Sequence, residues 1–214
     1  MKLVIFDIDG TLVDSQATIH GCMETAFAGA GLPSPSPSRA DVLSIVGLSL
    51  PQAMARLAPA QDTATLVDSY KQAYRAQRMA GNEAETSPLY PGARAALLRL
   101  NAREDVWLGV ATGKSKRGLD GLIAAHDLHG LFVTRQVADH HPSKPHPSML
   151  MQAMADVGAR PDQAVMVGDT TYDMDMAMAA GMPFIGVSWG YHATEQLGAA
   201  RAILGDFAEL DGLI

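Results

Sequence analysis

The sequence predicts an α/β fold with a three-layer, Rossmann-like core, a parallel sheet and an inserted all-helical domain. From residue 106 onward, short apolar runs alternate with helical patterns, which is typical of βαβ units whose helices cover both faces of a parallel sheet. One further apolar run, residues 3–6, stands alone near the N-terminus, and residues 15–84 contain helical patterns only. Since a lone strand among helices has no partner, we expect residues 3–6 to join the sheet and the helical stretch to be an insertion.

The composition is that of a folded protein without nucleic-acid or membrane partners. Of the 214 residues, 48% are hydrophobic and 18% charged, which favours a globular chain over a disordered one. The net charge of −7 argues against attraction to nucleic acid or anionic lipid, and no apolar stretch approaches the ~18 residues of a membrane span. The single cysteine, Cys22, fits a reducing compartment. We expect a cytoplasmic protein, monomeric or homodimeric.

The helical stretch begins after Ser15, a good N-cap candidate. Ile19, Met23 and Phe27 lie at helical spacing, and Pro51 suits the first turn of a later helix. The predicted helices cover residues 16–30, 39–46, 50–57 and 62–79. The first ends at 31–33, a short Ser- and Pro-rich loop covers 34–38, and residues 82–91 form a polar, turn-rich connection. The predicted domains are therefore the core, 1–14 with 87–214, and the helical insertion, 15–86.

The remaining elements follow in βαβ order. Buried strands are predicted where apolar runs are bounded by turn residues, and helices where the apolar period is close to 3.6. The predicted helices cover residues 92–101, 115–126, 147–157 and 172–180, and the predicted strands cover 106–111, 131–133, 164–167, 184–187 and 202–204.

Two carboxylates follow the first predicted strand. Asp7 and Asp9 come at its carboxyl end, and Gly10 and Thr11 then turn the chain. In open parallel sheets, ligands bind at the carboxyl ends of the strands. Two acids placed there repel each other unless a cation compensates their charge. An ordinary loop would explain one Asp and the Gly, but not the whole string.

Two further clusters follow later strands. The first comprises Thr112, Gly113 and Lys114, which follow the strand at 106–111 and open a helix. A hydroxyl, a backbone amide and a helix N-terminus there can bind an anion. A helix capped by Ser115 would explain the same residues. Lys144 lies in a Pro-rich loop, residues 141–147, whose rigid prolines would fix where the amine projects. A solvated loop lysine is the commoner alternative.

The histidines of the same region could suggest a metal site. His140, His141 and His146 lie close together in the sequence. No cysteine or second spaced histidine pair supports a zinc arrangement. We therefore interpret them as exposed loop histidines.

The last cluster surrounds Asp169, which follows the strand at 164–167. Asp173 lies four residues later, on the same face of the next predicted helix, whereas Asp175 lies off that face. Helix-dipole matching alone would also explain Asp173. Magnesium prefers oxygen ligands and often uses a few carboxylates together with water and phosphate. The four clusters together provide a carboxylate nucleophile, a second acid, anion donors and a cation site, which are the parts needed for phosphoryl transfer.

These motifs resemble those of the haloacid dehalogenase superfamily, in the branch with a helical cap inserted after the first motif. Residues 7–11, DIDGT, look like the first motif, Thr112 the second, Lys144 the third and residues 168–173 the fourth. The match spans the chain in motif order, and residues 15–86 fall where the family's cap falls. The first and fourth motifs are highly specific, and the other two are not specific alone.

A closer resemblance is to the phosphoglycolate phosphatase-like subgroup. Residues 12–15, LVDS, and Lys114 are similar to that subgroup. Gly113 departs from it, because the subgroup often has Asn there; a backbone donor remains but a side-chain donor is lost. This departure puts the exact substrate in doubt.

The resemblance implies roles for the acids. Asp7 would attack the phosphorus and form an aspartyl-phosphate. Asp9 would protonate the leaving oxygen and then deprotonate the hydrolytic water. Mg²⁺ would be held by Asp7, the backbone carbonyl of Asp9 and Asp169, with Asp173 as a ligand or a neighbour of the ligands.

The resemblance also implies how a small phosphorylated metabolite is bound. Thr112, the amide of Gly113 and Lys144 would hold the phosphoryl oxygens, and Gly10 and Thr11 would contribute to the substrate site. The cap would close over the site and contact the leaving group. Within it, His20 and the loop at residues 47–49 are candidates for facing the cleft, although a helix-surface role is favoured for His20.

Asp9 separates the alternatives within the superfamily. Haloacid dehalogenases and phosphonatases lack an acid at that position, so hydrolysis of a phosphate ester is favoured. A sugar-phosphate mutase similar to β-phosphoglucomutase keeps both acids and stays open. Outside the superfamily, a receiver-like phospho-acceptor domain uses similar residues, but it is shorter and lacks the helical insertion. A catalytically silent binding protein on this fold is the third alternative.

Overall fold

The core is a six-stranded parallel sheet. The computed structural model describes residues 1–31, 36–81 and 83–214. The strand order is β3-β2-β1-β4-β5-β6, and every neighbouring pair is parallel. The prediction that the N-terminal strand joins the sheet is confirmed: β1 lies between β2 and β4. The strands are β1 Lys2–Phe6, β2 Val106–Thr112, β3 Phe132–Val137, β4 Ala164–Gly168, β5 Phe184–Val187 and β6 Ala202–Leu204.

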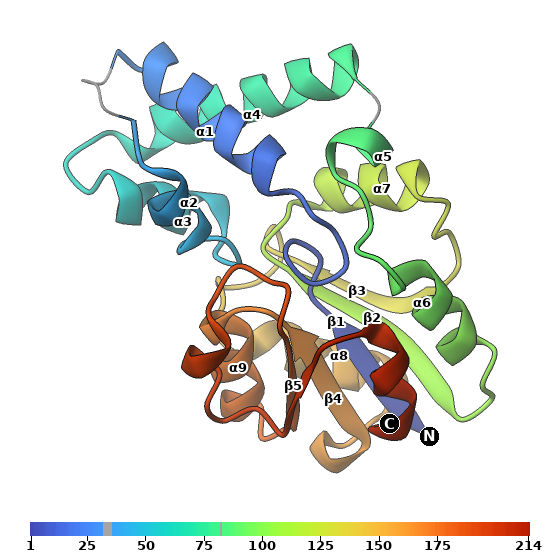
Figure 1. Ribbon diagram of the computed structural model, residues 1–214. Helices are drawn as coiled ribbons and strands as arrows, with labels where there is room; N and C mark the ends of the chain where they lie inside the picture. Colours follow the sequence, from blue (N-terminus) through green and yellow to red (C-terminus); the bar gives the residue numbers. More distant parts are fainter. Residues whose placement is uncertain (32–35, 82) are drawn as a thin grey trace.

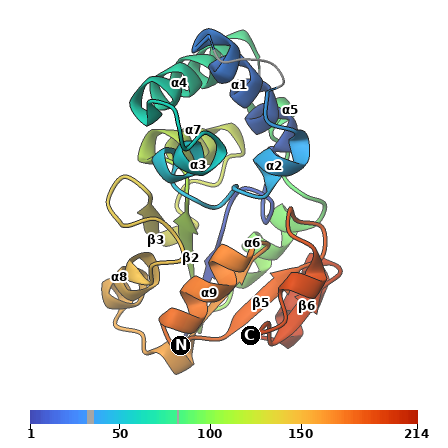
Figure 2. The same cartoon turned by 90° about the vertical axis from the view of Figure 1, so that its left-hand side faces the viewer.

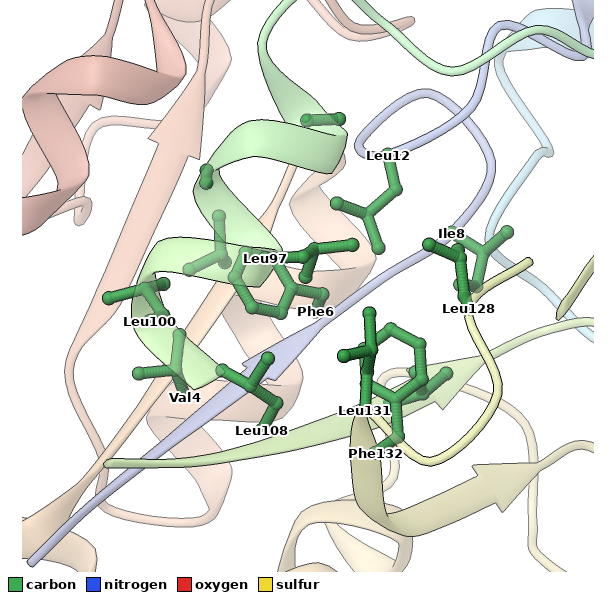
Figure 3. Packing of buried hydrophobic residues seen from close by; sticks show 14 of the residues in the cluster. Val4, Phe6, Ile8, Leu12, Leu97, Leu100, Leu108, Leu128, Leu131 and Phe132 are labelled. Carbon is green, nitrogen blue, oxygen red and sulfur yellow. The ribbon is translucent and has the colours of Figure 1, made fainter. Parts of the chain in front are cut away.

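Helices cover both faces of the sheet, which gives the three predicted layers. Alternate side chains of β1 point to opposite faces, so Phe6 packs with one set of helices and Ile5 with the other. Figure 3 shows the first cluster, in which Phe6, Leu97 and Leu108 meet. One face carries α6 Ala93–Asn101, α7 Lys116–Ala125 and the 3₁₀ helix η3 Phe207–Gly212; the other carries α8 Ser148–Val157 and α9 Thr171–Ala179. Two short 3₁₀ helices, η1 Pro161–Gln163 and η2 Thr194–Gln196, lie in connections.

The stretch between β1 and α6 is helical and has a hydrophobic cluster of its own. Met23, Met54 and Leu66 are buried in this cluster, together with Tyr172 of α9 from the core. In Figures 1 and 2 these helices lie over the end of the sheet where β1 finishes, opposite the two chain termini. The helices are α1 Gln16–Gly29, α2 Arg39–Leu43, α3 Leu50–Leu57, α4 Thr63–Ala80 and α5 Glu83–Thr86.

The two connections between this helical segment and the sheet lie side by side. Val13 forms an antiparallel bridge with Leu89. The amide of Asp14 donates to Pro88 O at 2.8 Å, and the amide of Tyr90 donates to Leu12 O at 2.9 Å. Paired connections of this kind limit how far the helical segment can move at its base. The predicted boundaries at residues 15 and 86 stay a prediction.

Two predicted elements have bounds that differ from the structure by more than one residue. The helix predicted over 39–46 ends at Leu43, because the chain continues in tighter turns to Gly47, whose φ of +102° is left-handed and favours glycine. The strand predicted over 131–133 is Phe132–Val137 instead. The strand continues through the polar residues Thr134 and Gln136, which are both buried and contact Asp156.

The connection predicted over 82–91 contains one helical turn, α5 Glu83–Thr86. It is held by the buried side chain of Glu83, which accepts from Tyr74 and pairs with Arg78 at 2.9 Å. The predicted helix end at 32–33, the start of the loop at 34–35 and Asn82 lie outside the described residues. None of the helices described here is long and apolar enough to pass through a bilayer.

Candidate active site

Asp7 lies at the middle of the sheet's carboxyl edge. It follows β1, and its amide donates to Val167 O of the neighbouring β4 at 3.0 Å. Its side chain is 1% exposed, and neither carboxylate oxygen makes a hydrogen bond within the described residues. The ammonium of Lys144 lies 2.9 Å from Oδ1, but not in hydrogen-bonding alignment. Burial and, to a smaller extent, the charge of the nearby Asp173 together raise the pKa of Asp7 to about 7 against the opposing charge of Lys144.

Asp7, Asp169 and Asp173 form one buried acidic cluster. Each offers a carboxylate oxygen, and these oxygens lie within 4.8 Å of one another. Asp169 follows β4, and Asp173 lies in the first turn of α9. Burial, followed by the charges of Asp173 and Asp7, raises the pKa of Asp169 well above its ordinary value. Three acids therefore converge although water cannot screen them.

Asp169 is held in place by the turn after β1. Thr11 Oγ1 donates to Asp169 Oδ1 at 2.8 Å, and the amide of Tyr191 donates to Oδ2 at 2.9 Å. Gly10 has a left-handed φ of +84°, and a Cβ there would lie 2.1 Å from Asp169 Oδ2. Only glycine leaves room for this approach. In this structure Gly10 and Thr11 therefore position Asp169, and their predicted contact with substrate stays a prediction.

Lys144 is fully buried among these acids. Its Nζ lies 2.7 Å from Asp173 Oδ1 and 2.9 Å from Asp7 Oδ1. Burial opposes its charge, but Asp173 and Asp7 outweigh that effect and raise the pKa of Lys144. The interpretation as a solvated loop lysine is wrong. The other oxygen of Asp173 accepts from the Thr170 amide at 3.1 Å and hydroxyl at 2.7 Å, so both ends of this carboxylate are fixed.

Asp9 belongs to a different set of contacts. Its Oδ1 lies 2.9 Å from Lys114 Nζ and accepts a hydrogen bond from Ser15 Oγ. Ser15 Oγ also lies 3.1 Å from the Tyr191 hydroxyl. Burial disfavours the charged ammonium, but Asp9 outweighs this and raises the pKa of Lys114. Ser15 precedes α1 without a side-chain capping bond, so its hydroxyl orients Asp9 instead of capping the helix as predicted.

The acidic cluster fits a hard divalent cation. Three carboxylates face one buried lysine, which leaves an uncompensated negative charge where burial is costly. Among the described residues, neither oxygen of Asp7 has a hydrogen-bond partner, so both have lone pairs available for a metal ion. Magnesium binds through one or two carboxylates together with water and phosphate. Asp7 and Asp169, with Asp173 close by, have the donor chemistry that this ion needs.

The end of β2 brings the core into contact with the helical segment. Thr112 is buried, and its Oγ1 accepts from the Lys114 amide at 3.2 Å. A Cβ on Gly113 would lie 2.7 Å from Gly47 O and 2.6 Å from Leu48 O, so the 47–49 loop packs directly on this glycine. The Gly113 departure from the subgroup pattern therefore has a structural reason: no side chain fits there.

A cavity of about 490 Å³ lies between the sheet edge and the helical segment. Of the predicted site residues, it is lined by Asp7, Asp9 and Gly113; the predicted 47–49 loop also lines it. The other predicted site residues are not among its lining: Gly10, Thr11, Thr112, Lys144, Asp169 and Asp173. The cavity thus reaches the proposed nucleophile and acid, and the other predicted residues lie outside its lining.

Cations surround the cavity. Lys71 and Arg75 of α4 and Arg117 of α7 are exposed lining residues, and none pairs with an acid within 1–31, 36–81 or 83–214. Unpaired cations around a cleft raise the local concentration of anions. This arrangement favours an anionic ligand although the whole chain is acidic.

The predicted histidines lie away from the chemistry. His20 lies 3.5 Å from Glu24 on α1 and does not line the cavity, which fits the favoured helix-surface role. His140 and His146 are exposed as predicted. The prediction is wrong for His141, which is partly buried. Its ring nitrogens contact Ser148 Oγ and Gln136 Oε1, both at 2.8 Å, so it ties the loop to the core.

Sequence reasoning missed three tyrosines. Tyr191 donates its amide to Asp169 and contacts Ser15 through its hydroxyl; its place in the loop after the strand at 184–187 was the available signal, since loops at that sheet edge meet the site. Tyr70 and Tyr74 line the cavity from α4. Their spacing of four residues places them on one face of the helix, but it does not show which face meets the site.

Comparison with known proteins identifies the family. The model for the family described as haloacid dehalogenase-like hydrolase matches residues 4–187. The chain belongs to this family. A protein of Dickeya dadantii named "Probable phosphatase IndB" is 37% identical over 98% of this chain and 92% of its own length. A phosphoglycolate phosphatase of Rhodospirillum rubrum is 34% identical over 98% and 89%. The resemblance drawn from the motifs is confirmed, and so is the prediction of an enzyme of this hydrolase family.

Solved structures share the fold. A hydrolase from Pseudomonas syringae superposes with a TM-score of 0.85 at 22% identity, covering 100% of this chain and 98% of its own. CbbY from Rhodobacter sphaeroides, solved in complex with phosphate, gives 0.83 at 22% identity, covering 98% and 96%. These likenesses confirm the predicted α/β architecture of the core.

Proposed function

We propose that this hydrolase is a Mg²⁺-dependent phosphatase that cleaves a small phosphorylated metabolite through an aspartyl-phosphate on Asp7. The observation that carries the proposal is the state of Asp7. It is a buried carboxylate whose two oxygens make no hydrogen bond to any residue that the structure describes, and it lines the cavity. A carboxylate with no hydrogen bonds to break is available as a nucleophile. The relatives named as phosphatases support the reaction class.

In the first half-reaction, an oxygen of Asp7 attacks the phosphorus of the ester. The new bond joins Asp7 to the phosphoryl group, and the bond from phosphorus to the leaving oxygen breaks. Asp9, in its protonated form, gives its proton to that leaving oxygen, so an alcohol departs. Lys144 supplies fixed positive charge 2.9 Å from the attacking carboxylate, where negative charge develops on the phosphoryl oxygens.

In the second half-reaction, water attacks the phosphorus of the aspartyl-phosphate. Asp9, now ionised, takes a proton from that water, the bond from phosphorus to Asp7 breaks, and inorganic phosphate is released. Lys114 and Ser15 contact Asp9 Oδ1 and hold the carboxyl group in place. The acid of the first step and the base of the second are then one residue, which returns to its starting state.

The proposed cation would be held by Asp7 and Asp169, with the Asp9 carbonyl and Asp173 contributing as the family resemblance implies. When bound, Mg²⁺ neutralises charge on the phosphoryl oxygens. We further propose that residues 15–86 act as the cap, excluding water from the site and contacting the leaving group. Gly113 and the 47–49 loop, which touch in this structure, are the contact that closes it.

The test is to detect the covalent intermediate. With Mg²⁺ and an aryl phosphate, wild-type protein should release inorganic phosphate and lose activity in EDTA. Asp9→Asn should slow turnover by at least about 10²-fold, the usual share of general acid–base catalysis, and a mass increase of one phosphoryl group should appear on the peptide that contains Asp7. Normal turnover in Asp9→Asn, or a label on another peptide, would overturn the assignment.

The same experiment separates hydrolysis from the alternatives. A sugar-phosphate mutase would transfer the phosphoryl group to a sugar hydroxyl with little release of inorganic phosphate. A phospho-acceptor or binding protein would be labelled once or not at all, without turnover. Release of many equivalents of phosphate per protein is therefore the outcome expected for a phosphatase. 2-Phosphoglycolate and sugar phosphates are the first substrates to compare, given the relatives' names.

A further inference from the structure

The cavity has a polar floor and an apolar roof. The floor, at the sheet edge, contains Asp7, Asp9 and Gly113. The roof comes from the helical segment: Ile19 and Met23 of α1, and Ile45, Val46 and Leu48 of the chain between α2 and α3. A leaving group attached to a phosphoryl group on the floor must extend into this roof. Its chemistry can therefore be inferred from the roof's side chains.

Two aromatic rings form the α4 side of the roof. Tyr70 and Tyr74 lie one helical turn apart, with ring centroids at 6.3 Å and an angle of 15° between the ring planes. The Tyr74 hydroxyl donates to Glu83 at 3.0 Å, which fixes that ring. The Tyr70 hydroxyl has no hydrogen-bond partner among the described residues. Two nearly parallel rings on one wall offer contact area at low entropic cost.

The cavity is too large for a two-carbon leaving group. Its volume of about 490 Å³ lies within the roughly 300–1,000 Å³ typical of pockets that enclose drug-sized ligands. A carboxymethyl group would leave the partly exposed rings of Tyr70 and Tyr74 without an apolar partner, and burying apolar area is the main source of binding energy at such a surface. The cationic rim around Lys71 and Arg75 attracts the phosphate dianion whatever the leaving group.

We propose that the preferred substrate is a phosphate monoester whose leaving group carries an apolar, ring-sized body that packs against Tyr70 and Tyr74. This inference rests on the proposed phosphatase function and names the substrate class for the same site. Tyr70 is then a specificity-determining residue. It contacts the part of the substrate that leaves, and the phosphoryl group lies on the floor.

The test compares esters whose leaving alcohols react alike but differ by one ring. Ethyl phosphate and 2-phenylethyl phosphate are both primary alkyl esters, and 2-phosphoglycolate adds the two-carbon acid. In the wild type, kcat/KM for 2-phenylethyl phosphate should exceed that for ethyl phosphate and for 2-phosphoglycolate by about tenfold or more, which is the scale of burying one aromatic ring. Equal values, or a preference for 2-phosphoglycolate, would overturn the inference.

A substitution on α4 then tests where the ring of the leaving group binds. Tyr70→Ala should lower the ratio of the two alkyl-ester values by about fivefold to tenfold. Gln72→Ala, an exposed residue of the same helix outside the cavity lining, is the matched control and should leave the ratio unchanged. An unchanged ratio in Tyr70→Ala would remove this residue from the inference. Circular dichroism checks that both variants fold, and the wild-type comparison holds even if Tyr70→Ala does not.

Failure of this inference is distinguishable from failure of the proposed function. If no ester is hydrolysed, or if hydrolysis does not depend on Asp7, the phosphatase function itself is wrong. If all three esters are hydrolysed in an Asp7-dependent manner without preference for the ring, the phosphatase function holds and the substrate class is wrong.

Discussion

The floor and the roof of the cavity are built in different ways. On the floor, Asp7 lies against Asp169, Asp173 and Lys144, which are outside the cavity lining; all four are 1% exposed or less. On the α4 side, Tyr70 of the roof is partly exposed, and Lys71 and Arg75 of the rim are exposed and make no ion pair within the described residues. Strand ends thus hold Asp7 and Asp169, whereas α4 holds aromatic and cationic side chains on the opposite side of the cavity.

Because the two parts differ, substitutions in the floor and in the roof should have different effects on the protein. We expect changes on the floor to affect the proposed chemical step, because Asp7 and Asp9 each lie 2.9 Å from a lysine ammonium. Changes on the roof affect which ester is preferred, because contacts there are apolar and spread over several helices. The predictions that follow test this division in order of decreasing effect.

Asp7→Asn should have the largest effect on activity and little effect on the fold. Without the nucleophile, kcat should fall by at least about 10⁴-fold. The pKa of Asp7 is raised by burial, so the folded state disfavours its charged form, and a neutral residue of the same shape should not lower the melting temperature without metal. Phosphate release and thermal unfolding measure the two effects. A lower melting temperature would show that Asp7 stabilises the fold, contrary to the expected role.

Magnesium should stabilise the floor. Binding to the folded state alone raises the free energy of unfolding by about 2.7 kcal/mol at a concentration of 100 times the dissociation constant, which corresponds to roughly 5–10 °C for a chain of this size. Asp169→Asn should abolish most of that rise, and most of the activity with it. Asp175→Asn, at an exposed acid of the following helix α9, is the matched control. An equal rise in Asp169→Asn would place the ion elsewhere.

Gly113→Asn should separate the floor from the roof. An Asn side chain would collide with the backbone oxygens of Gly47 and Leu48, because even a Cβ there would lie 2.6–2.7 Å from them. The 47–49 loop must then move away, and kcat/KM should fall by about tenfold as water enters the site, while Mg²⁺-induced stabilisation is retained. Gly130→Asn, at an open surface turn, controls for the added side chain. An unchanged kcat/KM would show that this contact is dispensable.

His20→Ala should have the smallest effect. His20 is a partly exposed residue of α1 that pairs with Glu24 and is not among the residues that line the cavity. Surface ion pairs contribute about 0–1 kcal/mol, so activity should stay within twofold of wild type and the melting temperature should change little. Steady-state kinetics with two esters of different size would check this. A change in ester preference would place His20 within the roof after all.

Much of the floor was predictable because it depends on local rules. Asp7 and Asp9 follow one apolar run and Asp169 follows another, so the rule for strand ends in parallel sheets is enough to bring them together. Thr11 and Asp173 followed from their spacing to these acids. Lys144 was harder, since a loop lysine is ordinarily solvated and only its acidic neighbours, distant in the sequence, bury it.

The α/β class, the helical insertion and the acids of the site could be predicted from the sequence alone, because periodicity and strand-end positions are local properties. The partners of those acids are known only from the tertiary structure, because the pairings of Asp9 with Lys114 and of Lys144 with Asp173 join residues that are distant along the chain. Which side chains form the roof of the cavity is likewise known only from the tertiary structure. Which face of α4 meets the cavity depends on how the helical segment sits on the sheet, and side-chain spacing within one helix carries no information about that placement.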